Sequence, residues 1–184
     1  MDRSQKTKSK EIPRVVGIDP GSTKAGIAYI TGKTLYPFSP KDFKLIDVLT
    51  LAPKGKISLN KRVHLFHETI YSLLSDYKPT HCAIETCFVG VNPQSAIKLG
   101  LVRGAIITAV SRLGIPILEI APTTVKKIIT GHGHAKKEEV ALCLEKLLAC
   151  NIGDLSYDAS DALAIALSCG LSLAGQEKGS ILSL

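Results

Sequence analysis

The chain has 184 residues, of which 45% are hydrophobic and 21% are charged, a size that suits one ordinary domain. This composition excludes intrinsic disorder, and the 15 glycines and 9 prolines show no collagen-like period. No apolar stretch approaches the roughly 20 residues of a membrane span, and the polar, basic N-terminus does not read as a secretory signal. The sequence therefore predicts a soluble protein.

The charge of the chain is strongly basic, with 23 Lys and Arg against 16 Asp and Glu and a net charge of +7. This excess favours a polyanionic partner such as nucleic acid, because basic side chains displace counterions from phosphates; the alternative is a solubilising surface. No Cys-x-x-Cys pair occurs among the five cysteines, Cys82, Cys87, Cys143, Cys150 and Cys169. We therefore expect neither a disulfide framework nor a zinc site, and a cytoplasmic location.

Strands dominate the first part of the chain. Residues 1–13 are expected to form a disordered basic arm. Short runs rich in β-branched residues at 14–19, 25–31 and 43–51 then predict three strands, separated by turn residues such as the Pro20-Gly21 pair. The short connections imply an antiparallel meander.

Helices and strands alternate in the remainder of the chain. Helical spacing and breaker residues predict helices at 58–77, 93–112, 123–130, 136–149 and from 157 to about 169, with strands at 81–85 and 115–120. This order predicts an α/β sandwich, a five-stranded mixed sheet flanked by helices. We expect one domain over residues 14–170 and a flexible tail over 171–184.

Four acidic residues stand where carboxylates are costly. Asp19 and Glu85 each end an apolar strand, and Asp158 and Asp161 share one face of the last helix at i, i+3 spacing. If the first and fourth strands are neighbours, Asp19 and Glu85 lie side by side at one sheet edge, and the last helix can bring the other two across from them. Alternatively, Asp19 belongs only to a turn, and the helix acids only complement the helix dipole.

A set of oxygen ligands without His or Cys suits Mg²⁺, for which Mn²⁺ can substitute. Two such ions about 4 Å apart activate water and stabilise the leaving oxygen in phosphodiester cleavage. We therefore predict that the four acids are both metal ligands and catalytic residues.

Four motifs carry a family resemblance: Gly-Ile-Asp-Pro-Gly-Ser at 17–22, Ala-Ile-Glu at 83–85, Ser-Ala-Ile-Lys-Leu-Gly at 95–100 running on to Arg103 and Gly104, and Asp-Ala-Ser-Asp-Ala-Leu-Ala at 158–164. In order and spacing, from about residue 15 to residue 168, the chain resembles the RuvC family of Holliday-junction resolvases. The resemblance implies a ribonuclease-H-like three-layer sandwich and a homodimer. It also implies Mg²⁺-dependent paired nicks in four-way DNA junctions during recombination and repair, leaving 5′-phosphate and 3′-hydroxyl ends. RuvA and RuvB become expected partners.

The resemblance also suggests residues that contact DNA. Asp19, Glu85, Asp158 and Asp161 take its four acidic positions, and some relatives have a histidine at the position of Asp158. Lys126 and Lys137 match basic positions near the phosphate backbone, Phe88 matches an aromatic that acts on bases at the junction centre, and Arg103 is expected to contact DNA. The alternatives are ordinary solvated lysines and a core phenylalanine.

Other patterns are less specific. Gly100 and Gly104 lie four apart on one predicted helix, which suits either packing on the sheet or the dimer contact that the family favours. The histidine pairs 64/67 and 132/134 lack the further ligands that a metal site needs. The Asp-x-Gly-Ser turn also occurs in sugar kinases and actin-like ATPases, but 184 residues leave no room for the second domain these require. A nuclease-fold relative that processes RNA, or one that only binds junctions, stays an alternative.

Overall fold

A computed structural model describes residues 12–32, 40–87 and 92–177. Its sheet has the strand order β3-β2-β1-β4-β5. The strands are β1 (Arg14–Pro20), β2 (Ala25–Gly32), β3 (Phe43–Leu51), β4 (His81–Glu85) and β5 (Ile117–Ile120). Strands β1, β2 and β3 pair antiparallel, whereas β4 runs parallel to both β1 and β5. The predicted meander, the mixed five-stranded sheet and the adjacency of the first and fourth strands are thus confirmed.

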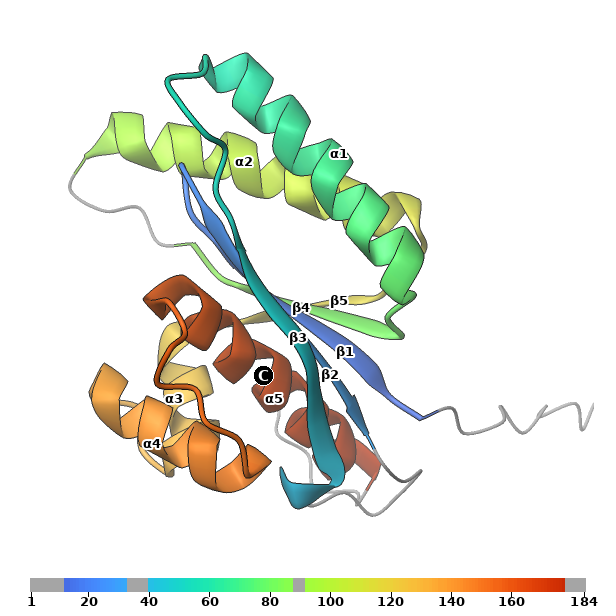
Figure 1. Ribbon diagram of the computed structural model, residues 1–184, viewed down its shortest axis with the longest axis vertical. Helices are drawn as coiled ribbons and strands as arrows, with labels where there is room; N and C mark the ends of the chain where they lie inside the picture. The colour runs from blue at the N-terminus through green and yellow to red at the C-terminus, as the bar shows by residue number, and fades with distance from the viewer. Residues whose placement is uncertain (1–11, 33–39, 88–91, 178–184) are drawn as a thin grey trace, which may run out of the picture.

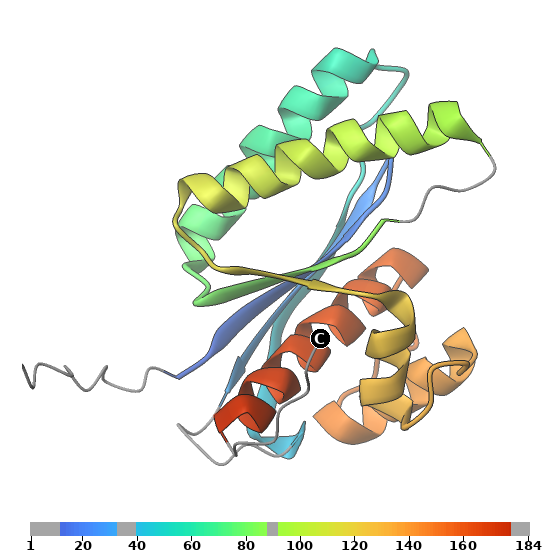
Figure 2. The same cartoon turned by 180° about the vertical axis from the view of Figure 1, so that it is seen from behind.

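Helices cover both faces of the sheet and make the molecule three-layered (Figures 1 and 2). On one face lie α1 (Leu59–Tyr77) and α2 (Pro93–Arg112); on the other lie α3 (Pro122–Thr130), α4 (Lys137–Leu148) and α5 (Tyr157–Glu177). A single 3₁₀ turn, η1 (Pro40–Asp42), precedes β3. In the described part of the chain, no helix combines the length and apolar character needed to cross a bilayer.

Strand β1 contributes side chains to both halves of the core, one on each face of the sheet. Its Val16 and Ile18 are fully buried beneath α1 and α2, whereas Val15 is buried in the cluster that α3, α4 and α5 form with the other face. This alternation follows from the two-residue period of a strand. Residues 17 and 19 therefore face α5, and this orientation aims Asp19 at the last helix.

Helix α5 is longer than its sequence suggests. It continues to Glu177, well past the expected end near Cys169, so the prediction of a flexible tail is wrong for residues 171–177. Packing explains the extension: Gly170 lies against the ring of Phe43, and Leu171 and Leu173 pack on the core cluster beneath α5. Residues 178–184 and most of the predicted basic arm lie outside the described residues.

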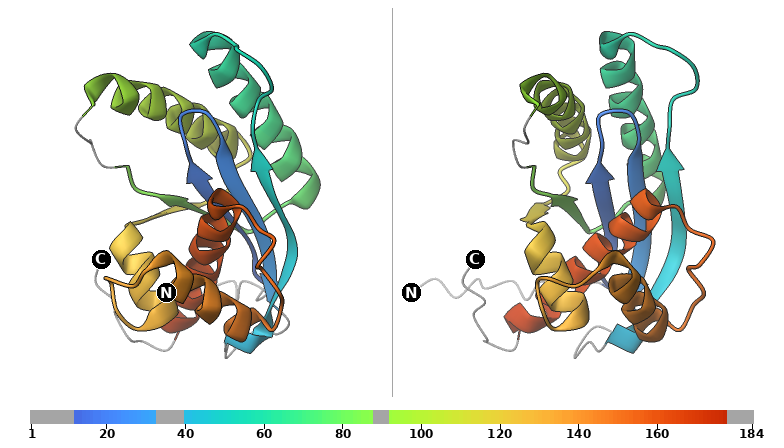
Figure 3. Two further views of the ribbon diagram at one scale, coloured as in Figure 1. Left: turned by 60° about the vertical axis from the view of Figure 1, so that its left-hand side comes forward. Right: turned by 90° about the vertical axis from the view of Figure 1, so that its left-hand side faces the viewer.

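The close approach of α5 to the sheet depends on two glycines. A Cβ atom at Gly17 would collide with the backbone of Ala162 and Ala166, and one at Gly26 would collide with the carbonyl of Asp158. Figure 3 shows α5 lying across the sheet on the side away from α1 and α2. Only the absence of a side chain at both positions lets the helix backbone rest directly on β1 and β2.

Replacing Gly17 by Ala is expected to lower the free energy of unfolding by about 2–3 kcal/mol, because helix backbone has to shift to admit the methyl group. The measurement is urea denaturation followed by circular dichroism. Ser111→Ala at an exposed position of α2 is the control: alanine is the better helix former, so stability is expected to stay equal or rise by less than about 0.7 kcal/mol. Equal stabilities of the Gly17→Ala variant and the wild type would contradict the packing argument.

Candidate active site

Two of the predicted acids end neighbouring parallel strands. Ile18 of β1 is paired with Ile84 of β4, so the next residues along these strands, Asp19 and Glu85, lie side by side at the carboxyl edge of the sheet. Both isoleucines are buried against α1 and α2. The two carboxylates therefore point to the opposite face, toward α5.

The other two acids come from the first turn of α5. Asp158 is the second residue of this helix and Asp161 the fifth, so both project from the same side of its N-terminal turn. The contact at Gly26, where the Asp158 backbone rests on β2, fixes this turn next to the end of β1. Carboxylates from three separate parts of the chain thus lie along one edge of the sheet.

The electrostatics show how near these acids lie to one another. Burial is the largest cause that raises the pKa of Asp19 to about 6, and repulsion from Asp161 and Asp158 adds to the rise. Burial is likewise the largest cause that raises the pKa of Glu85 to about 7, and repulsion from Asp19 and Asp161 adds to it. The edge therefore concentrates negative charge that the protein alone accommodates poorly.

Two lysines partly offset this charge. The Nζ atom of Lys24 lies 2.6 Å from Oδ2 of Asp158, and Lys137 donates a 2.6 Å hydrogen bond to Oδ2 of Asp161. That bond raises the pKa of Lys137, which also lies over the ring of Tyr157, 5.4 Å from its centroid. Lys24 comes from the turn between β1 and β2, and sequence reasoning did not single it out.

The donor set is suited to a hard cation, but it does not form a closed ligand shell. Within residues 12–32, 40–87 and 92–177, no three His, Cys, Asp or Glu side chains stand close enough to hold one metal ion. Two of the four acids are instead turned toward lysines. The Oδ2 atom of Asp158 is buried and, despite the nearby ammonium, makes no hydrogen bond of acceptable geometry. An all-oxygen set with mutually repelling, partly buried carboxylates fits a divalent cation that takes the place of the lysines.

A cleft of about 270 Å³ opens beside the acids. Glu85 and Asp161 line it together with Lys126 of α3 and Lys137 of α4. Both predicted phosphate-contacting lysines thus border the same hollow as two of the acids, and the positive charge of Lys126 and Lys137 opposes the rise in the Glu85 pKa. The arrangement can accept a polyanion at the acidic edge.

Arg103 is engaged within the protein. Its side chain is only 16% exposed, and its guanidinium donates to the carboxylate of Glu119 on β5 and to the backbone carbonyl of Glu85, the latter at 3.4 Å. It therefore braces the ends of β4 and β5, and its predicted DNA contact stays a prediction. Glu119 was not anticipated, since a lone glutamate in a short strand gives no signal of such pairing. Phe88 lies outside the described residues.

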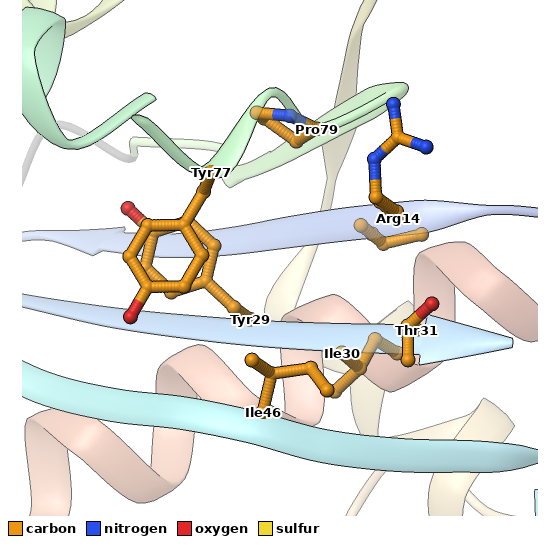
Figure 4. A pocket seen from close by; sticks show the side chains of 8 residues that line it. Arg14, Tyr29, Ile30, Thr31, Ile46, Tyr77 and Pro79 are labelled. Carbon is orange, nitrogen blue, oxygen red and sulfur yellow. The ribbon is translucent and has the colours of Figure 1, made fainter. Parts of the chain in front are cut away.

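Two histidines have glutamate partners, and one pocket lies at the far end of β1. His67 and His132 are each bound to a glutamate, Glu68 and Glu139. A second pocket of about 230 Å³ lies where β1 begins, at the other end of the strand from Asp19; Arg14 and Thr31 are beside it, and Tyr29 stacks on Tyr77 at a centroid distance of 3.9 Å (Figure 4). The described residues that line this pocket include no acid.

The family model described as crossover junction endodeoxyribonuclease RuvC matches residues 15–169 of the chain. The chain belongs to this family. The RuvC of Chloroherpeton thalassium is 41% identical over 155 residues, which cover 84% of this chain and 80% of that protein. RuvC of T. thermophilus, solved in complex with a Holliday junction substrate, matches with a TM-score of 0.81 and 30% identity over 91% of this chain and 97% of that chain. The yeast mitochondrial Holliday junction resolvase Ydc2 covers 94% and 85% of the two chains; at 12% identity and a TM-score of 0.65 it shares the fold alone.

Membership in the RuvC family confirms the resemblance and the ribonuclease-H-like fold. The chain is a crossover junction endodeoxyribonuclease, a hydrolase of DNA phosphodiester bonds from a family that depends on divalent metal ions. The nuclease prediction thus prevails over the ATPase alternative.

The raised pKa values predict how stability changes with pH in the presence of a chelator. Between about pH 4.5 and 7 the folded protein binds more protons at Asp19 and Glu85 than the unfolded chain does, so the free energy of unfolding falls as the pH rises through this window. The substitution Glu85→Gln removes the part of this fall in the free energy of unfolding that comes from ionisation of Glu85. We expect the variant to be more stable than wild type at pH 8 by about 1–2 kcal/mol after solvent screening, and equally stable at pH 4.5.

Urea titrations at the two pH values measure this difference. The matched control is Glu68→Gln on α1. There, the hydrogen bond with His67 lowers the pKa of the carboxyl, so removing its charge is not expected to stabilise the protein at pH 8. A Glu85→Gln variant with the wild-type pH profile would show that Glu85 is well solvated and not crowded by the other acids.

Proposed function

We propose that this enzyme resolves four-way DNA junctions by nicking two strands symmetrically, leaving 5′-phosphate and 3′-hydroxyl ends, in recombination and repair. The convergence of Asp19, Glu85, Asp158 and Asp161 at one sheet edge carries the proposal. The T. thermophilus relative solved with a Holliday junction supports the choice of substrate.

The four acids are the proposed metal ligands, and Mg²⁺ is the proposed ion, with two in each active site and Mn²⁺ as a substitute. The oxygen-only donor set and the crowding of charge around Asp19 support this choice. When bound, the ions supply Lewis acidity to the attacking water and to the leaving oxygen. Asp158 and Asp161 would hold such ions at a fixed place, because α5 is fixed against β1 and β2.

The basic residues of the cleft are the proposed phosphate contacts. Lys126 and Lys137 line the hollow beside Glu85 and Asp161, where their ammonium groups neutralise a phosphate and the charge that develops on it. Lys137 donates to Asp161 and also lines the cleft, so its ammonium would stay within reach of a bound phosphate if Asp161 held a metal ion. Phe88 follows Glu85 by three residues and is proposed, by the family resemblance, to act on bases at the junction centre.

A homodimer is proposed, because symmetric nicks need two active sites. Helix α2 carries an exposed apolar stripe: Ile97 is 63% exposed and Leu101 48%. Nothing in the described chain would lie within 4 Å of a Cβ at Gly100 or Gly104, so a second copy could approach this helix closely. The family further suggests RuvA and RuvB as partners and a cytoplasmic location.

Replacing Asp19 by Asn or Glu85 by Gln is expected to lower the rate of junction cutting by about 10³-fold or more, because either change removes a charged ligand from the site. Junction affinity in a mobility-shift assay is expected to remain within about threefold of wild type. Asp154→Asn, in the exposed loop before α5, is the matched control and is expected to cut normally.

The assay compares a synthetic four-way junction with linear duplex and RNA–DNA hybrid in Mg²⁺. Symmetric nicks in the junction alone support the proposed function. Preferential cutting of the hybrid would instead assign the enzyme to RNA processing. Normal cutting by either variant would show that the replaced acid is not a catalytic residue.

Replacing Leu101 by Asp is expected to shift the protein from dimer to monomer in analytical ultracentrifugation, because a charge in the apolar stripe opposes association of two identical faces. Ile46→Asp on β3 is the matched control, since Ile46 is 49% exposed and lies on the outer strand of the sheet. A dimer of unchanged strength in the Leu101→Asp variant would place the interface elsewhere.

A further inference from the structure

The ion pair between Lys24 and Asp158 differs from the other lysine–carboxylate pair of the site. It joins the turn after β1 to the first turn of α5, with 2.6 Å between Nζ and Oδ2. The lysine side chain is 53% exposed, whereas that of Asp158 is only 23% exposed. A solvated, flexible cation thus covers a mostly buried oxygen of one proposed metal ligand.

The backbone that carries Lys24 is held independently of this ion pair. Arg62 of α1 donates a 3.0 Å hydrogen bond to the carbonyl of Ser22, and the turn folds so tightly that a Cβ at Gly21 would collide with the carbonyl of Lys24. The ammonium can therefore leave Asp158 by rotation of its own side chain, while the turn and α5 stay in place.

Lys24 differs in this respect from the second lysine of the site. Lys137 makes a hydrogen bond to Asp161, lies over the ring of Tyr157 and lines the cleft beside Glu85. Among the described residues, the ion-pair partner of Lys24 is Asp158; the charge of Lys24 also opposes the rise in the Asp19 pKa, and Lys24 does not line that cleft. Its position suits a counter-ion of the carboxylate better than a contact with the reacting phosphate.

We propose that Lys24 is a built-in competitor for the divalent ion: its ammonium occupies Asp158 in the metal-free enzyme and has to be displaced before Asp158 ligates metal. The inference rests on the proposed function, in which Asp158 is a ligand. It follows that Lys24 weakens the affinity for divalent ions and so sets the metal concentration at which the site fills.

A positioning role for Lys24 would predict the opposite change in metal affinity. If Lys24 prepared Asp158 for metal by holding it in place, removing the ammonium would weaken metal binding. If Lys24 competes, removing it leaves a carboxylate that lacks a cation and binds metal more tightly. Damage to the fold lowers affinity, so a gain in affinity cannot arise from misfolding.

The experiment titrates Mn²⁺ into the full-length, metal-free protein without DNA and measures free Mn²⁺ by electron paramagnetic resonance. Lys24→Gln is expected to bind Mn²⁺ about two- to fivefold more tightly than wild type, the range for a partly exposed ion pair. Lys24→Arg keeps the charge and is expected to retain near wild-type affinity. Lys44→Gln is the control: it lies level with Arg14, at the end of the sheet away from Asp19, and is expected to change nothing.

A double-mutant cycle with Asp158→Asn separates the ion pair from a general effect of charge. The gain from Lys24→Gln is expected to become much smaller when Asp158 is already neutral, with a remainder from the longer-range effect of Lys24 on Asp19. An unchanged or lower affinity in Lys24→Gln, or an equal gain in both backgrounds, would overturn the inference. If Asp158→Asn binds Mn²⁺ as well as wild type, or wild type binds none, it is the proposed ligand role of Asp158 that fails.

Discussion

The direct contact between the backbone of α5 and the strands β1 and β2 is the constraint on which the site depends. At Gly17 and Gly26 no side chain separates helix from sheet, so the carbonyls of Ala162 and Asp158 rest where a Cβ would otherwise lie. Interior glycine weakens a strand, and here the close approach compensates for this cost. Without it, the first turn of α5 would stand farther from the sheet and its two acids farther from Asp19.

Assembling the acids conflicts with stability, and the lysines ease this conflict without removing it. Burial and mutual repulsion hold the pKa values of Asp19 and Glu85 at about 6 and about 7, so part of the edge is protonated near neutral pH. Lys24 and Lys137 neutralise the two acids of α5. Such a site favours a divalent cation, because one divalent ion can bind several carboxylates at once, whereas each lysine forms an ion pair with one.

Much of this fold could be predicted because its signals are local. The β-branched runs, the breakers and the acids at the ends of strands identified β1, β4 and the edge shared by Asp19 and Glu85. The end of α5 could not be predicted from local signals, because it depends on Gly170 lying against Phe43 and on Leu171 and Leu173 packing on the core. The same holds for the pairing of Lys24 with Asp158, since a lysine in a turn is ordinarily solvated and only the tertiary structure brings α5 within its reach.

Helix α2 connects the proposed dimer face with the acidic edge. Its outer surface exposes Ile97 and Leu101, and the side chain of Arg103, two residues farther on, reaches the carbonyl of Glu85. The same guanidinium holds Glu119, so the ends of β4 and β5 are tied to this one helix. A second copy seated on α2 would therefore contact the helix whose Arg103 is bonded to the Glu85 carbonyl. Because a two-fold dimer applies the same contact to both subunits, the two active sites would be held in equivalent geometry, which nicks at symmetric positions require.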